Sequence, residues 1–206
     1  MKKDGTIAMF RYWNTLRAGR IAPYRSDIDP TAIKGRLPET FILELDEPEE
    51  IRFRLAGTNV CAVFGQELRH LSFASLWRAQ DRATLVELAR SAMIEGAVVL
   101  AECAGTTRQG RRAAFELLLL PLDAGPGRPR AIGTLIAMDR PYWLGAHPVL
   151  DLSLEFARLI DPQTAIVDVG RATPSIAPDA ASLLGGEQAP RRVRHLVVLE
   201  GGKPSR

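Results

Sequence analysis

Cysteine and histidine are scarce in this chain of 206 residues, which contains two cysteines and three histidines. Cys61 and Cys103 are too few for a disulfide framework, and no set of residues has metal-ligand spacing. No apolar run approaches the roughly 20 residues needed to cross a bilayer. The first residues carry positive charge, but the apolar segment of a secretion signal does not follow. These absences favour a cytoplasmic protein with free thiols, and they predict no metal site.

Charge of one sign is not in large excess either. The chain has 27 basic and 24 acidic residues, a net charge of +3 and a pI of about 9.1, which is modest for a nucleic-acid binder. The excess lies in residues 189–206, where five basic residues oppose Glu200 alone. This basic tail contains no Phe, Tyr or Trp for base stacking, and such clusters are more often solvated termini. We therefore expect neither nucleic acid nor a membrane as a partner.

An amphipathic helix is predicted near the start of the chain. Met9, Trp13 and Leu16 follow one another at i, i+4 and i+7, which gives the helix an apolar stripe. Pro23 is expected to end it. Asp29-Pro30 then combines an N-cap residue with a proline at the first helical position, and it predicts a second short helix.

Five later segments alternate apolar with other residues and are predicted strands: Thr40–Leu45, Ile51–Ala56, Val98–Thr107, Ala113–Leu122 and Ile132–Met138. Between the second and third, Gly65 should close a brief helix, and Asp81–Glu95 should form a longer one. Asp81 is the expected cap of that helix, and Gly96 lies just beyond its end. This order predicts an α+β fold with a five-stranded antiparallel sheet and helices grouped on one face.

The C-terminal region has weaker patterns. Pro148–Ile160 is predicted to form one helix through Leu152, Phe156 and Leu159. Prolines and glycines then punctuate the sequence without a sustained period, which predicts a partly disordered linker before the basic tail.

Three motifs carry a resemblance to a known family: Tyr12-Trp13-Asn14-Thr15-Leu16-Arg17-Ala18-Gly19-Arg20, Arg54-Leu55-Ala56-Gly57-Thr58 and Phe64-Gly65-Gln66-Glu67-Leu68. With them the chain resembles a bacterial family of stand-alone PAS-type domains, first catalogued as a domain of unknown function. The resemblance covers roughly Met9–Pro141. It implies a role in sensing or protein interaction, and no catalytic machinery comes with it.

The resemblance and the sequence patterns together predict a division of the chain and a second layer. An N-terminal helical cap (1–36) would precede a PAS core (37–141), and a C-terminal helix, linker and basic tail would follow (142–206). Within the core, the predicted strand Ala113–Leu122 is apolar on both faces, whereas a sheet with one solvated face would alternate. Something must therefore cover the outer face of the sheet, and the N-terminal helix is the candidate.

That helix belongs either to the same chain or to a partner chain. PAS domains often dimerise through such a helix, so the resemblance implies a homodimer with Phe10, Trp13 and Leu16 at its interface. The alternative is a monomer in which the helix covers its own sheet.

A ligand pocket is the second candidate site. In a PAS fold the sheet and the helices after the second strand enclose a cavity, and Phe64, Trp77 and Met93 are candidates to line it and bind a cofactor. Aromatic and methionine residues at such spacing are more often ordinary core. The cofactor, if any, therefore stays unknown from the sequence.

Haem and flavin are both disfavoured as that cofactor. Haem needs an axial ligand, usually histidine, and the helix that carries it in haem-binding PAS proteins contains none here. His70 lies in the helical section, where a solvated histidine is the simpler interpretation. The flavin-binding light sensors use an Asn-Cys-Arg motif, which Asn59-Val60-Cys61-Ala62 matches in neither order nor spacing.

Catalysis finds little support, since no phosphate loop, nucleophile elbow or metal-binding histidine pair is present. Glu102 and Glu116 lie on adjacent predicted strands and could form an acid/base pair. Our leading hypothesis is a cytoplasmic PAS-type sensory and regulatory protein that acts through protein contacts, with a small ligand as a candidate gate. The alternatives are an enzyme with a small apolar substrate in the cavity and either glutamate as base, or an adaptor that uses the basic tail.

Overall fold

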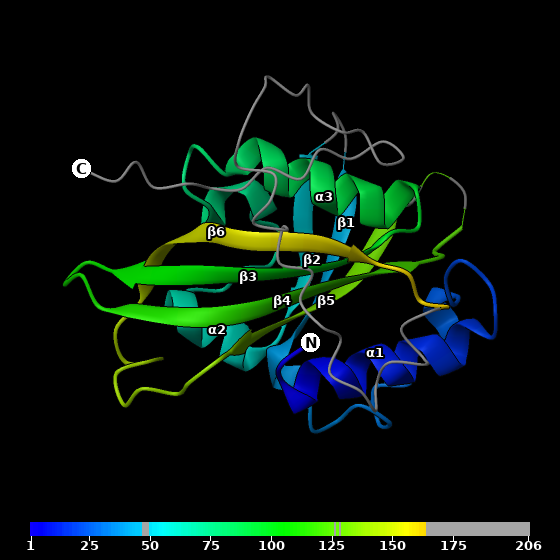
Figure 1. Cartoon of the computed structure of the whole chain (residues 1–206), viewed down its shortest axis with the longest axis horizontal. Coiled ribbons are helices and arrows are strands. Elements are labelled where there is room, and N and C mark those ends of the chain that lie inside the picture. The colour runs from blue at the N-terminus through cyan, green and yellow to red at the C-terminus, as the bar shows by residue number, and fades with distance from the viewer. Residues whose placement is uncertain (47–49, 126, 128, 164–206) are drawn as a thin grey trace, which may run out of the picture. The chain divides into compact units, whose positions relative to one another are not determined.

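The computed structural model describes residues 1–46, 50–125, 127 and 129–163 of the chain (Figure 1). By its internal contacts the chain divides into Met1–Ile160 and Asp161–Arg206. The second unit lies almost entirely outside the described residues, and so do the predicted linker and basic tail. All that follows concerns the first unit.

The described residues form one antiparallel sheet of six strands in the order β2-β1-β5-β4-β3-β6. The strands are β1 (Thr40–Asp46), β2 (Glu50–Ala56), β3 (Val98–Thr107), β4 (Arg112–Leu122), β5 (Arg130–Ala137) and β6 (Val149–Ile160). The predicted α+β PAS architecture is confirmed, and all five predicted strands are present within two residues of their expected limits.

The sixth strand corrects the predicted count, because Pro148–Ile160 was expected to be a helix. Leu150, Leu152 and Leu154 alternate with polar residues, which is a period of two. Residues Val149–Ile160 pair with β3 along its whole length, and this pairing outweighs the weak i, i+4 spacing of Leu152 and Phe156.

Within the described residues, three helices and three short 3-10 turns accompany the sheet. They are α1 (Asp4–Arg17), α2 (Thr58–Phe64), α3 (Arg82–Ile94), η1 (Arg25–Asp27), η2 (Leu37–Glu39) and η3 (Phe73–Leu76). α1 ends at Ala18, which has a positive φ of 47°, well before Pro23. The predicted second helix after Asp29 is replaced by turns, since the Asp29 carboxylate accepts bonds from the backbone N–H and hydroxyl of Thr31 and so favours a local turn.

The inner face of the sheet is covered by α2, η3 and α3 (Figure 1). Its core contains a row of four aromatic rings, Phe41, Phe53, Phe73 and Trp77. The distances between the centroids of successive rings are 5.5, 5.9 and 5.7 Å. Such tilted and edge-to-face pairs are favourable beyond their buried area. This row joins β1 and β2 to η3.

The outer face is covered by α1, which packs on β4 and β5 of its own chain (Figure 1). The prediction that β4 is buried on both faces is confirmed, because Leu117, Leu118, Leu119 and Leu120 are each no more than 1% exposed. Of the two possible covers, the structure shows the helix of the same chain.

β4 and the residue after it hold α1 and the segment that follows. The indole N–H of Trp13 donates to the carbonyl oxygen of Pro121 at 2.8 Å. Beyond the helix, the Arg25 N–H donates to the Asp123 carbonyl at 2.6 Å, and the Asp123 N–H donates to the Pro23 carbonyl at 3.0 Å. The N-terminal segment is thus anchored along the second half of β4.

We predict that Trp13→Ala lowers the free energy of unfolding by about 3–5 kcal/mol, because a fully buried indole leaves a large cavity. Trp13→Phe keeps most of the ring but leaves the Pro121 carbonyl without its donor, so it should cost about 1–3 kcal/mol. Urea unfolding of both variants measures these values. A Trp13→Ala variant as stable as the wild type would contradict the position of α1.

Candidate functional site

The predicted pocket residues are all buried on the inner side of the fold. Phe64 closes α2, Trp77 follows η3, and Met93 lies in the last turn of α3, with exposed fractions of 5, 1 and 8%. Trp77 belongs to the aromatic row, and its indole nitrogen has no hydrogen-bond partner within the described residues. A buried donor without an acceptor is costly, so Trp77 is the one of the three residues whose side chain offers a free hydrogen-bond donor to a ligand.

Two cavities lie away from these residues. One of about 580 Å³ is lined by the start of α1, η2 and the end of β5. A smaller one of about 120 Å³ shares Glu39, Asn59 and Arg140 with it and reaches α2. The Arg140 guanidinium pairs with one Glu39 carboxylate oxygen at 2.5 Å. This ion pair therefore lines both cavities. Phe64, Trp77 and Met93 line neither cavity.

On the outer face, Glu116 of β4 is a fully buried carboxylate in an apolar strand. One oxygen accepts the backbone N–H of Lys2 at 2.6 Å, and the other accepts that of Lys3 at 3.0 Å. Lys3 is the N-cap of α1 and makes no side-chain cap of its own. Glu116 of β4 therefore supplies the negative charge that the N-terminus of a helix favours, although it is not part of that helix.

Glu102 lies directly opposite Glu116 on β3, so the sequence correctly placed these two carboxylates side by side. Glu102 pairs with the Lys2 ammonium group at 2.7 Å. Both carboxylates, however, lie on the sheet face that α1 covers, opposite to the face of η3 and the aromatic row. The alternative hypothesis of an enzyme placed either glutamate as a base in the inner cavity, and strand alternation instead puts both side chains on the other face of the sheet.

Two hydroxyl groups weaken the attachment of α1. Thr6 in α1 and Thr134 in β5 are fully buried, and neither hydroxyl oxygen has a hydrogen-bond partner within the described part of the chain. Thr134 shares the outer face with Glu116, since it lies opposite Leu118. An unsatisfied buried hydroxyl costs about 1–3 kcal/mol, so the outer face is covered at a lower net gain than its apolar area suggests.

The predicted dimer residues are largely used within one chain. Phe10 and Trp13 are 2 and 0% exposed against their own sheet, and Leu16 is half-buried. Self-association through these side chains therefore stays a prediction, and it would require α1 to leave the sheet.

Histidine and metal ligands offer no further site in the described residues. His70 is exposed and has a positive φ of 68°. No group of three or more potential metal ligands occurs in the part of the chain that the structure describes. Among the same residues, no helix is long and apolar enough to span a membrane.

Both thiols are shielded. Burial raises the pKa of the Cys103 thiol far above its ordinary value, and burial also raises the pKa of Cys61. The half-buried Cys61 thiol additionally lies 3.6 Å from a Glu67 carboxylate oxygen, whose charge disfavours the thiolate. Neither side chain is set up as a nucleophile.

We predict slow thiol chemistry. Because a raised pKa reduces the thiolate fraction at neutral pH, Cys61 should react with an aromatic disulfide reagent more slowly than a free thiol, and its rate should still rise at pH values where a free thiol has levelled off. Cys103 should react only on unfolding. Cys61→Ser is the control, and rapid labelling of that variant in native buffer would contradict the burial of Cys103.

A family model and two solved structures are similar to parts of this chain. The family model described as PAS domain matches residues 1–136. Among solved structures, the chain is similar to the d2 variant of RsLOV, at 18% identity and a TM-score of 0.39, over 50% of this chain and 60% of that one. It is also similar to a second RsLOV variant, at 16% identity and a TM-score of 0.38, over 52% of this chain and 65% of that one.

The chain thus covers less than two thirds of either of these structures, and no curated protein matches it. The family model, in contrast, takes in α1, the inner helices and the strands from β1 to β5, which is about two thirds of the chain. This chain therefore belongs to the PAS domain family, whose members are typically sensory rather than catalytic.

Proposed function

We propose that this chain is a regulatory PAS domain that acts through protein–protein contacts, with α1 as a displaceable cover of the outer sheet face. The observation that carries the proposal is that this one helix shields an apolar face by packing on β4 and β5, and that Glu116 and Pro121 of β4 accept the hydrogen bonds of Lys2, Lys3 and Trp13. Displacement of α1 would expose apolar side chains such as Leu118 and Leu120 to a partner. Exposed apolar patches of this kind are typical of interaction sites.

The contacts of α1 suit a cover that can leave. The residues at its start make two hydrogen bonds to Glu116, and the buried hydroxyls of Thr6 in the helix and Thr134 in the sheet have no partner in the described residues. At its other end, Ala18 and Gly19 both have positive φ, and nothing crowds Gly19 within 4 Å. Hinges are commonly a few residues at the end of an element.

A small ligand inside the core is the second part of the proposal. The Trp77 N–H is a buried donor that a ligand acceptor would satisfy, and the ring lies at the end of the aromatic row next to α3. Phe64 and Met93 are the further residues we propose for the lining. A ligand that accepts a hydrogen bond from Trp77 would stabilise one packing of η3 and α3 relative to another.

We predict that Glu116→Gln loosens α1, since the loss of a charged acceptor for two N–H groups removes about 1.5–3 kcal/mol. Amide hydrogen exchange in α1 should accelerate by about tenfold to a hundredfold. Thr134→Val should slow it, because the valine matches the shape without an unsatisfied hydroxyl. Glu102→Gln is the control and should have little effect, since its ion pair is partly exposed.

Partner capture tests the functional half of the same prediction. Proteins bound from a bacterial lysate are compared between the Glu116→Gln and Thr134→Val variants, and each candidate is then purified and titrated against both. A partner of the outer face should bind Glu116→Gln more tightly than Thr134→Val. Equal affinity for the two variants would show that α1 does not control access to the partner site.

The ligand half has its own prediction. Native mass spectrometry of the purified chain should show a small molecule that is retained by the wild type and lost in Trp77→Phe, which keeps most of the ring but lacks the indole N–H. A wild-type spectrum with the mass of the bare chain, also after incubation with cell extract, would remove the ligand from the proposal and leave the role of α1 untouched.

A further inference from the structure

The edge strand β6 is protected along only half of its length. Its one partner among the described strands is β3, so its outer edge offers unpaired backbone groups of the kind that natural sheets usually cover. A loop covers the first half, and the second half, Glu155–Ile160, has no such cover within the described residues. This difference is the basis of the inference.

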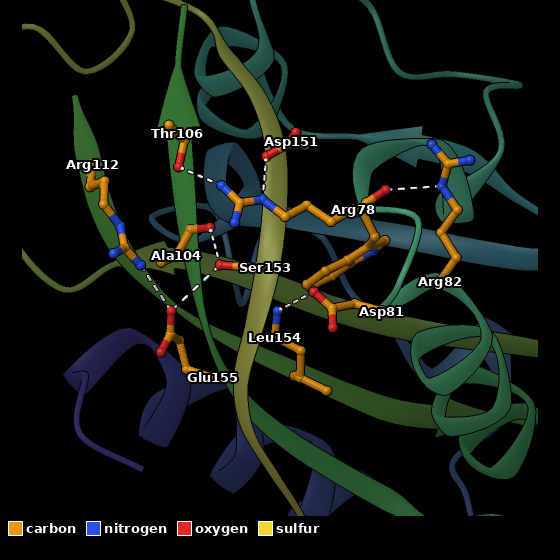
Figure 2. Close-up of polar contacts among 11 residues, drawn as sticks. Arg78, Asp81, Arg82, Ala104, Thr106, Arg112, Asp151, Ser153, Leu154 and Glu155 are labelled. Carbon is orange, nitrogen blue, oxygen red and sulfur yellow. Dashed lines mark hydrogen bonds and ion pairs between the residues drawn. The ribbon is translucent and has the colours of Figure 1, made fainter. Parts of the chain in front are cut away.

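The covering loop consists of Trp77–Asp81, between η3 and α3. Trp77 forms an isolated parallel bridge with Leu152, and the Arg78 N–H donates to the Leu152 carbonyl at 2.9 Å. The Asp81 carboxylate accepts the Leu154 N–H at 3.1 Å (Figure 2). Asp81 stands at the N-cap of α3 but makes no cap bond with its side chain, so its carboxylate serves the strand.

Side chains reinforce the same protected half. The Arg78 guanidinium pairs with Asp151 at 3.1 Å and donates to the Thr106 hydroxyl at 3.2 Å (Figure 2). Arg112 pairs with Glu155 at 3.0 Å, at the boundary between the two halves. The first half of the edge therefore cannot receive another strand without the loss of these contacts.

The open half carries exposed apolar side chains. Phe156 is 49% exposed and Leu159 is 42% exposed. A β-bulge between Leu154 and Phe156 separates the two halves. Bulges disrupt strand pairing locally, and here the bulge lies where the covering loop ends. An open edge with exposed apolar residues is the arrangement to which an added strand binds.

We propose that a second copy of this chain pairs with the open half of β6, antiparallel and about a two-fold axis at Ala157. In that register Phe156 lies opposite the partner's Arg158, and Arg158 lies opposite the partner's Phe156. The two side chains share a sheet face, since they pair with Glu102 and Leu100 of β3. Each arginine would stack on a phenylalanine ring and extend toward Glu102, a carboxylate on the same face.

Charge and size select this register and this occupant. A shift of two residues in one direction would place the two Arg158 side chains opposite each other, which is repulsive. A shift of two residues in the other direction would place the partner's Arg158 opposite Leu154, in the covered half, where the Asp81 carboxylate already accepts the Leu154 N–H. At the axis, Ala157 would face its own copy, and a small residue permits close approach. A self-complementary edge of this kind fits a two-fold dimer. Because the pairing is short, the interface is small, and the dimer should form in the micromolar range or weaker.

This inference is independent of the proposed displacement of α1, and analytical ultracentrifugation of the full chain over about 1 µM to 1 mM tests it. The wild type should show a concentration-dependent dimer. Phe156→Arg, which opposes two arginines, should raise the dissociation constant by about tenfold or more. Leu150→Arg is the matched control: Leu150 is 55% exposed but lies in the covered half, so its dimer should be unchanged.

The register is tested by Ala157→Cys in a Cys61→Ala background, where the other thiol, Cys103, is buried. Opposed residues of an antiparallel pair have Cα atoms about 4.5–5.5 Å apart, within the range that a disulfide spans. Mild oxidation of this variant should give a covalent dimer. A wild type that stays monomeric at every concentration would overturn the proposal. So would a dimer that Phe156→Arg does not weaken and that the Ala157→Cys variant does not cross-link, since it would use another surface.

Discussion

β4 is a strand with apolar side chains on both faces, and the need to keep both faces from water determines the architecture. The inner face packs with α3 and lies in the layer of the aromatic row, as in any sheet with helices grouped on one side. The outer face must be buried separately, and α1 does this within the same chain. Burial of a leucine contributes about 1.5–3 kcal/mol, so an uncovered outer face would leave a large part of the small net stability of a domain unrealised.

Apolar contact alone does not fix where α1 begins, because the hydrophobic effect is non-directional. The register comes from polar groups at defined points of β4. Glu116 accepts the N–H groups of Lys2 and Lys3, and Pro121 accepts the indole N–H of Trp13. A buried carboxyl group without these donors would be strongly unfavourable, so a slide of α1 along the strand would lose the hydrogen bonds of Glu116.

Local patterns predicted much of this fold because the local and tertiary preferences agree. Alternation identified the five PAS strands, and Gly65 and Gly96 both follow helices with positive φ as expected. β6 was missed because its leucines also fit a helical spacing, and only its pairing with β3 decides between the two. The partners of Glu116 are backbone groups, which leave no trace in the pattern of side chains.

The polar residues of the edge show the same limit. Asp81 was correctly placed at the start of α3, but its carboxylate binds the Leu154 N–H and not the helix. The sequence shows Arg78 and Asp81 as charged residues before the helix and Asp151 as a charged residue far along the chain, but nothing in it shows that they meet. Their spatial match follows from strand order, which local periodicity does not contain.

Trp77 joins the interior to the rim of the sheet. Its ring ends the aromatic row, its backbone bridges Leu152, and its carbonyl oxygen accepts the Arg82 guanidinium at 2.9 Å. A shift of this residue along the sheet normal must either break the bridge or carry the neighbouring strand with it. The packing of the aromatic row and the geometry of the outermost strand are therefore mechanically coupled through Trp77 and the loop that begins with it.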